Sequence, residues 1–154
     1  MNVRDVSGDL LEQQVDVIVN PWNRSLIPWW LLLPQGVSGA IKRKAGNAVF
    51  RELAKYGPIP LGQARLTSAG NLNYKGIIHV AGINGFWIAT RYSISQSVRS
   101  AVELAEAQNF TSIAFPLIGA GAGNRGRAFS REIMLETFAT IESQIEVTLV
   151  TYNG

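Results

Sequence analysis

The chain has no cysteine and only one histidine, His79, among its 154 residues. The absence of cysteine excludes disulfides and thiol chemistry, and it fits a cytoplasmic protein. A lone histidine argues against a metal site built on imidazole ligands, and we expect neither a metal nor a cofactor. The longest apolar run, residues 26–33, is interrupted by Pro28 and is too short to cross a bilayer. The first residues also lack the apolar core of a signal peptide, so we expect no membrane association.

Charge is sparse as well. Charged residues make up 16% of the chain against 47% hydrophobic residues, which favours a compact globular protein, and at this length we expect one domain, residues 1–154. The net charge of +3 suits an anionic ligand, but the basic residues form no arm or stripe that would indicate nucleic-acid binding. Only Lys42, Arg43 and Lys44 cluster, and we interpret them as a solvated helix face.

Strand and helix patterns alternate along the chain. Apolar runs predict strands over residues 2–7, 15–20, 64–68, 76–81, 112–117 and 146–152. Helical spacing predicts helices over residues 38–56, with a break near Gly46, and over 92–107 and 126–142. This alternation implies helices on both faces of a sheet. The predicted fold is therefore α/β, a three-layer α/β/α domain with a mixed, mostly parallel central sheet.

Glycine is concentrated where a late strand meets a helix. Residues 113–126 run from an apolar strand into a loop where glycines alternate with small residues, at Gly119, Gly121 and Gly123. Such a loop lets backbone N–H groups approach an anion, and the helix N-terminus adds partial positive charge. The Gly-Lys-Ser/Thr ending of a P-loop is missing. From the residues alone, a phosphate site and a turn that packs strand against helix both stay open.

A second strand, glycine loop and helix lies near the N-terminus. Residues 15–23 form a predicted buried strand that ends in two asparagines, Asn20 and Asn23, and residues 35–41 form a glycine-rich turn that opens a helix. In open α/β sheets, ligands bind beyond the carboxyl ends of the strands. We therefore hypothesise that the two loops hold a diphosphate from opposite sides.

In order and spacing, these motifs resemble the macro domains, a family that binds ADP-ribose. Residues 8–10 are similar to the family's early Gly-Asp-Ile, and residues 19–23 to its Val-Asn-Ala-Ala-Asn. Residues 36–41 are similar to the first phosphate loop, and residues 116–121 to the second. Three further segments follow the family's order: residues 45–46, 62–64 and 77–82. The resemblance spans nearly the whole chain and implies the same three-layer fold.

The resemblance implies ADP-ribose, free or attached to a macromolecule, as the ligand. Asp9 would accept a hydrogen bond from the adenine amino group, and the Leu10 N–H would meet a ring nitrogen. Asn23 would contact the distal ribose, and Asn23 and Ser38 are the catalytic candidates, whereas Asn20 orders the backbone. The loops supply the other expected ligand contacts, which are Gln35, Gly36, Val37 and Ser38, then Ile118, Gly119, Ala120, Gly121, Ala122, Gly123 and Asn124.

Four further residues in or beside these motifs are not assigned a ligand contact. His79 lies in an apolar strand, and we interpret it as a core histidine with satisfied hydrogen bonds. Gly39 is expected to pack a helix closely against a strand. Thr67 and Ser68 are strand-end hydroxyls to which the sequence assigns no role.

The chain departs from the family pattern in both loops. Hydrolytic members commonly carry an aspartate where this chain has Ser38, and a serine supplies no carboxylate to orient or deprotonate water. An aromatic residue usually lies near the distal ribose where this chain has Gly123. These departures leave three functions open. They are a hydrolase that removes ADP-ribose from modified targets or from O-acyl-ADP-ribose, a non-catalytic ADP-ribose reader, and a phosphatase for ADP-ribose 1″-phosphate.

An apolar insertion, residues 26–34, separates the asparagines from the first loop. It carries Trp29 and Trp30, and Trp22 precedes it. Two interpretations stay open. The tryptophans form an aromatic wall for the distal ribose, or they pack in a satellite core or a protein contact through which the chain self-associates.

Overall fold

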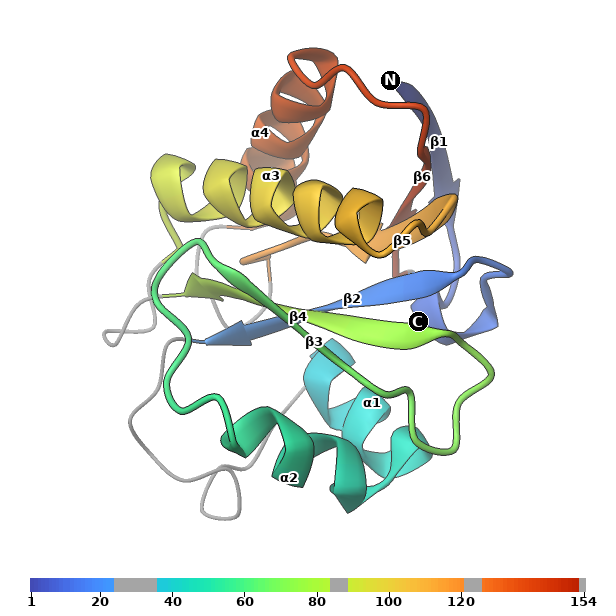
Figure 1. The fold of residues 1–154 in the computed structure, drawn as a ribbon. Coiled ribbons are helices and arrows are strands. Elements are labelled where there is room, and N and C mark those ends of the chain that lie inside the picture. The colour runs from blue at the N-terminus through green and yellow to red at the C-terminus, as the bar shows by residue number, and fades with distance from the viewer. Residues whose placement is uncertain (24–35, 84–88, 121–125, 153–154) are drawn as a thin grey trace.

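The computed structural model describes residues 1–23, 36–83, 89–120 and 126–152 (Figure 1). The strands of this part are β1 (Asn2–Ser7), β2 (Val17–Asn23), β3 (Ala64–Thr67), β4 (Gly76–Ile83), β5 (Ser112–Pro116) and β6 (Glu146–Thr151). The helices are α1 (Gly36–Ala45), α2 (Asn47–Ala54), α3 (Arg91–Ala107) and α4 (Arg127–Ala139), with a short 3-10 turn η1 (Leu10–Glu12). None of these helices has the length and hydropathy that a bilayer crossing requires.

The described strands form one mixed sheet in the order β1-β6-β5-β2-β4-β3. The pairs β1–β6, β5–β6, β2–β5 and β2–β4 are parallel, and β3 runs antiparallel to β4 at one edge. Helices α1 and α2 cover one face of the sheet, and α3 and α4 cover the other (Figure 1). The predicted three-layer α/β/α fold with a mostly parallel sheet is confirmed.

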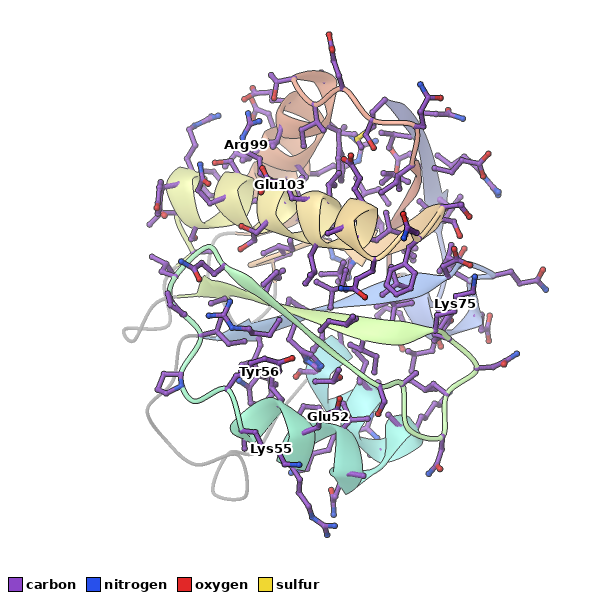
Figure 2. The ribbon with its side chains drawn as sticks, in the orientation of Figure 1. Glu52, Lys55, Tyr56, Lys75, Arg99 and Glu103 are labelled. Carbon is purple, nitrogen blue, oxygen red and sulfur yellow. The ribbon has the colours of Figure 1, made fainter. Side chains whose placement is uncertain are left out.

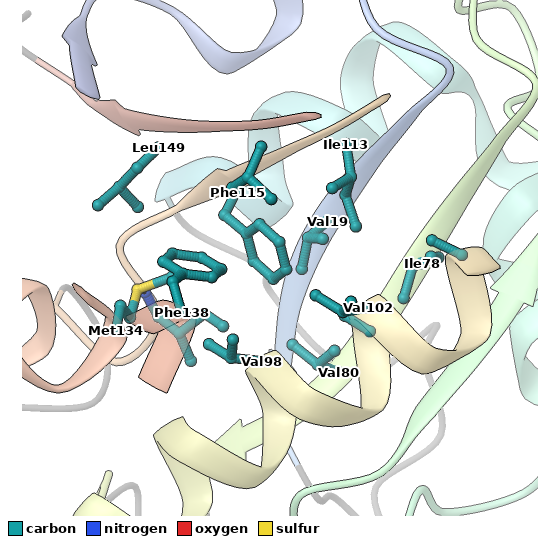
Figure 3. Packing of buried hydrophobic residues seen from close by; sticks show 14 of the residues in the cluster. Val19, Ile78, Val80, Val98, Val102, Ile113, Phe115, Met134, Phe138 and Leu149 are labelled. Atoms are coloured by element: carbon teal, nitrogen blue, oxygen red, sulfur yellow. The ribbon is translucent and has the colours of Figure 1, made fainter. Parts of the chain in front are cut away.

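Two apolar cores fill the space between the layers. On the α3 and α4 side, the rings of Phe115 and Phe138 meet edge to face with centroids 5.2 Å apart, among the side chains drawn in Figure 3. On the α1 and α2 side, Ile18 packs with Ile41 and Phe50. Because successive strand residues point to opposite faces, β2 contributes to both cores and is buried on both faces, as predicted.

The long helix predicted over residues 38–56 is two helices. Gly46 separates α1 from α2 with φ = +96°, a backbone conformation that favours glycine, so the predicted break is confirmed. The strand predicted over residues 15–20 instead spans Val17–Asn23. Its start is later because the Asp16 N–H donates to Ser112 Oγ at 2.8 Å. Its end is later because β4 continues to Ile83, which pairs with Asn23.

Candidate functional site

A pocket of about 600 Å³ opens at the carboxyl ends of β1, β5 and β6. Its walls are the turn after β1, the length of α1, the end of β5 with the loop that follows, the first residue of α4, and the end of β6. These segments are far apart in the sequence. Parallel pairing brings them to one edge of the sheet, where open α/β folds bind ligands.

Asp9 is placed at this edge by the turn that ends β1. It is the N-cap of η1, and its Oδ1 accepts a hydrogen bond from the Leu11 N–H at 2.9 Å. Capping therefore fixes the carboxylate beside the pocket that it lines. Leu10 also lines the pocket, although only 4% of the residue is exposed.

The first loop leads into α1, which forms one wall. Val37 and Ala40 line the pocket from its first turns. Ser38 is 8% exposed, and its Oγ has no hydrogen-bond partner among the residues that the structure describes. Gly36 is the first residue of α1. Gln35 lies outside the described residues, and so does the side chain of Asn23.

The described residues of the second loop lie partly in the core and partly in the pocket wall. The Ile118 side chain is buried in the core beneath α3 and α4, and its N–H donates to Met134 Sδ at 3.4 Å. Gly119 has φ = +80°, and a Cβ there would lie 2.5 Å from the Ala89 Cβ, so both conformation and packing require glycine. Ala120 lines the pocket. The other predicted loop contacts, Gly121, Ala122, Gly123 and Asn124, lie outside the described residues.

A buried hydrogen-bonded chain ties β2 to β4 and β3. The Asn20 Nδ2 donates to His79 Nδ1 at 2.9 Å, and His79 Nε2 lies 2.8 Å from Thr67 Oγ1. The Thr67 hydroxyl donates to the Ser68 carbonyl, which leaves Nε2 to carry the imidazole proton. Asn20 and His79 are both 0% exposed. The satisfied core histidine is confirmed. Asn20 has a structural role, but its Nδ2 pairs with the His79 ring and not with the loop backbone, and its buried Oδ1 has no partner among the described residues. Thr67 gains a role that the sequence did not indicate.

Comparisons with known proteins agree on one family. The macro domain family model matches residues 19–134. An uncharacterised protein of Aquifex aeolicus is 34% identical over 92% of this chain and 84% of its own length. An O-acetyl-ADP-ribose deacetylase of Citrobacter koseri is 36% identical over 86% of this chain and 75% of its own length.

A solved structure extends this agreement to three dimensions. The Oceanobacillus iheyensis macrodomain with ADP has a TM-score of 0.82 at 26% identity, over 96% of this chain and 82% of that one. The chain belongs to the macro domain family. The resemblance stated from its motifs is thereby confirmed.

Four charged or aromatic residues in the described pocket lining of this macro domain escaped the sequence analysis. Arg43 and Lys44, which were interpreted as a solvated helix face, line the pocket with exposed side chains. The spacing could have predicted the place of Lys44, since Val37, Ala40 and Lys44 lie on one face of a helix. Arg127, the first residue of α4, and Tyr152, which directly follows β6, also line the pocket.

The three tryptophans in and before the insertion fall into two groups. The Trp22 ring packs against Phe50 of α2, with centroids 5.3 Å apart, and is partly buried against the core on that side of the sheet. Trp29 and Trp30 lie outside the described residues. The aromatic wall and the self-association contact expected of them stay predictions.

The buried His79 predicts pH-dependent stability. Burial lowers its pKa from 6.5 to about 3, because desolvation penalises the charged imidazolium. Below pH 6.5 the unfolded chain binds a proton that the folded protein excludes. The free energy of unfolding therefore decreases as the pH is lowered from 6.5, and it levels off near pH 3. In urea titrations we expect a loss approaching about 1.4 kcal/mol per pH unit between pH 6 and 4.5.

The variant His79→Gln is the control. It lacks the titrating ring but keeps a donor and an acceptor, so its stability is lower at neutral pH and nearly flat over the same range. Since His79 is the only histidine of the chain, equal slopes in the two proteins would contradict this assignment.

Proposed function

We propose that this macro domain binds ADP-ribose in the pocket and hydrolyses it from modified macromolecules or from O-acyl-ADP-ribose. The observation that carries the proposal is one pocket that joins the Asp9 carboxylate and the Tyr152 ring to the N-termini of α1 and α4. These are the groups that an adenine base and a diphosphate require. The relative named O-acetyl-ADP-ribose deacetylase supports the reaction, and a variant of the O. iheyensis macrodomain solved with ADPR supports the ligand.

The base end is assigned to the turn after β1 and the end of β6. Asp9 uses Oδ1 to cap η1, and the second carboxylate oxygen can accept from an amino group of the base. Tyr152 is 56% exposed beside it, which offers one ring face to a stacked purine. Leu10 contributes an apolar contact and its backbone N–H.

The diphosphate is assigned to the two helix N-termini. The first turn of α1 presents backbone N–H groups at Val37, and the last described residue of the second loop, Ala120, faces the same pocket. The N-cap of α4 is Gly126, which makes no side-chain capping bond, so the first N–H groups of α4 lack that partner. Arg127 adds a full positive charge at this helix start.

Hydrolysis is assigned to Asn23 and Ser38. The Ser38 Oγ is buried and has no partner among the described residues, a state that costs about 1–3 kcal/mol and that a hydrogen bond to ligand or water would relieve. With no carboxylate at this position, the attacking water is held by an amide, by backbone groups or by the substrate's own phosphate. Such positioning lowers a barrier without a strong general base, so we expect slow turnover.

A non-catalytic reader is the second candidate. Ser38 favours it, because the carboxylate common in hydrolytic members is missing from the first loop. A reader would use the same base and diphosphate contacts and leave the distal ribose intact.

A cytoplasmic location stays a prediction.

The Asp9 contact predicts an effect on binding that is separate from folding. Asp9→Asn keeps the oxygen that caps η1 but presents an amino group where the second carboxylate oxygen stood, so it cannot accept from adenine. We expect calorimetry to show ADP-ribose affinity weakened by about 1–3 kcal/mol with the melting temperature nearly unchanged. Unchanged affinity would place the base elsewhere.

Stacking on Tyr152 predicts a different pair of results. Tyr152→Ala should weaken ADP-ribose binding by about 1–3 kcal/mol, whereas Tyr152→Phe keeps the ring and the affinity. Tyr92→Ala, which removes an equally exposed ring from α3 outside the pocket, is the matched control and should bind as the wild type does. Equal losses in Tyr152→Ala and Tyr92→Ala would contradict the assignment.

Turnover separates the hydrolase from its alternatives. We expect slow release of ADP-ribose from ADP-ribosylated protein or from O-acetyl-ADP-ribose, and no comparable reaction with ADP-ribose 1″-phosphate. Asn23→Ala should lower the rate more than the affinity, and Ser38→Asp should raise the rate. Tight binding without turnover of any of the three substrates would establish the reader instead.

A further inference from the structure

Two cations in the pocket have no role in the contacts assigned above. Among the described residues, the pocket is lined by three basic side chains, Arg43, Lys44 and Arg127, and by one carboxylate, Asp9. Neither Arg43 nor Lys44 forms an ion pair with a described residue. Both side chains are exposed, so their charged groups are accessible to a ligand.

The basic run Lys42–Lys44 does not behave as a uniformly solvated face. The Lys42 ammonium lies 6.0 Å from the centroid of the Phe50 ring, toward α2, whereas Arg43 and Lys44 line the pocket. Cations near a helix C-terminus also compensate the helix dipole, but that effect does not require them to border a ligand cavity. Arg43 and Lys44 are therefore available to an anionic group that enters the pocket.

The position of that anion follows from the helix geometry. Arg43 and Lys44 come six and seven residues after Val37, which places their backbones about 9 to 10.5 Å from Val37 along the axis of α1. The diphosphate is assigned to that first turn, with Arg127 and the N-terminus of α4 on its other side. An anion bound beside the last turn of α1, and not beside its first turn, would be a different group of the ligand.

We propose that Arg43 and Lys44 form a second anion subsite, for a phosphate group that the adenosine ribose of the ligand carries either directly or through a further sugar. The subsite rests on the proposed ADP-ribose pocket. In an adenine nucleotide the ribose hydroxyls lie between the base and the diphosphate, so a phosphate on one of them falls between the Asp9 end and the first turn of α1. An arginine fork and a neighbouring ammonium are suited to two oxygens of one phosphate.

Two ligands share this chemistry. One is a nucleotide with a terminal 2′-phosphate, and the other is an ADP-ribose unit whose 2′ oxygen continues through further sugar and phosphate groups. Calorimetry at low salt compares three probes, which are ADP-ribose, 2′-phospho-ADP-ribose, and two ADP-ribose units joined through the 2′ oxygen. We expect the wild type to bind at least one of the two extended probes about tenfold more tightly than ADP-ribose. The probe that gains identifies the source of the phosphate.

The double variant Arg43→Gln/Lys44→Gln tests the assignment. It should bind all three probes with nearly the same affinity, and its ADP-ribose affinity should change by less than about threefold. The matched control is Arg51→Gln/Lys55→Gln, at Arg51 of α2 and at Lys55, which directly follows α2. It removes the same two kinds of charge from exposed positions that do not line the pocket; Figure 2 labels Lys55. The control should keep the preference of the wild type.

Three results would overturn the subsite. Equal binding of all probes by the wild type would do so while leaving the proposed function intact. An equal loss of all probes in Arg43→Gln/Lys44→Gln would assign the two cations to the diphosphate. Absence of binding for every probe would overturn the proposed function together with the subsite.

Discussion

Parallel pairing of β1 and β5 with β6 is the constraint on which the candidate site depends. It places the carboxyl ends of three strands at one edge of the sheet, although these ends are separated by most of the chain. Asp9, Pro116 and Tyr152 become walls of one pocket as a direct result. Side chains at the opposite ends of the same strands cannot reach this pocket, since each strand is about 15 to 20 Å long.

A buried polar chain fixes the other half of the sheet, strands β2, β4 and β3. Desolvated Asn20 and His79 would destabilise the fold if either lost its partner, because each buried polar group without a hydrogen bond costs about 1–3 kcal/mol. Their bond fixes the register of β2 against β4, and the bond to Thr67 extends the constraint to the antiparallel edge strand. The chain then reaches the surface, where Glu52 of α2 accepts from Ser68, and Figure 2 labels Glu52.

The fold could be predicted from the sequence because each strand, helix and break is encoded by residues that are close together in the chain. Apolar runs fixed the strands, Gly46 marked the break between two helices, and alternation of strand and helix predicted the layers. The roles of Asn20 and His79 were also predictable, since a polar residue inside a buried strand needs a partner. Ile118 shows the limit of a motif, because its position in a glycine loop did not reveal that its side chain fills the core.

The pocket walls were harder to predict because they depend on contacts between distant segments. Tyr152 follows an ordinary strand, and only the pairing of β6 with β1 places it beside Asp9. Arg43 and Lys44 belong to a basic run of the kind that is usually exposed to solvent. The packing of α1 over the sheet determines that these two of the three adjacent cations line the cavity, whereas Lys42 lies near Phe50. The sequence pattern and the family resemblance therefore located the two loops. Only the tertiary structure showed that Arg43, Lys44 and the Tyr152 ring line the same pocket.

Amide hydrogen exchange with and without ADP-ribose tests the central claim most directly. That claim is that one ligand contacts the turn after β1, the start of α1 and the second loop at the same time. We predict simultaneous slowing of exchange at residues 9–11, 37–40 and 117–120, with no change in the pocket between β3 and α3 around residues 61–65. AMP should slow the first segment more than the other two. Protection confined to residues 61–65, or absent from residues 9–11, would contradict the account.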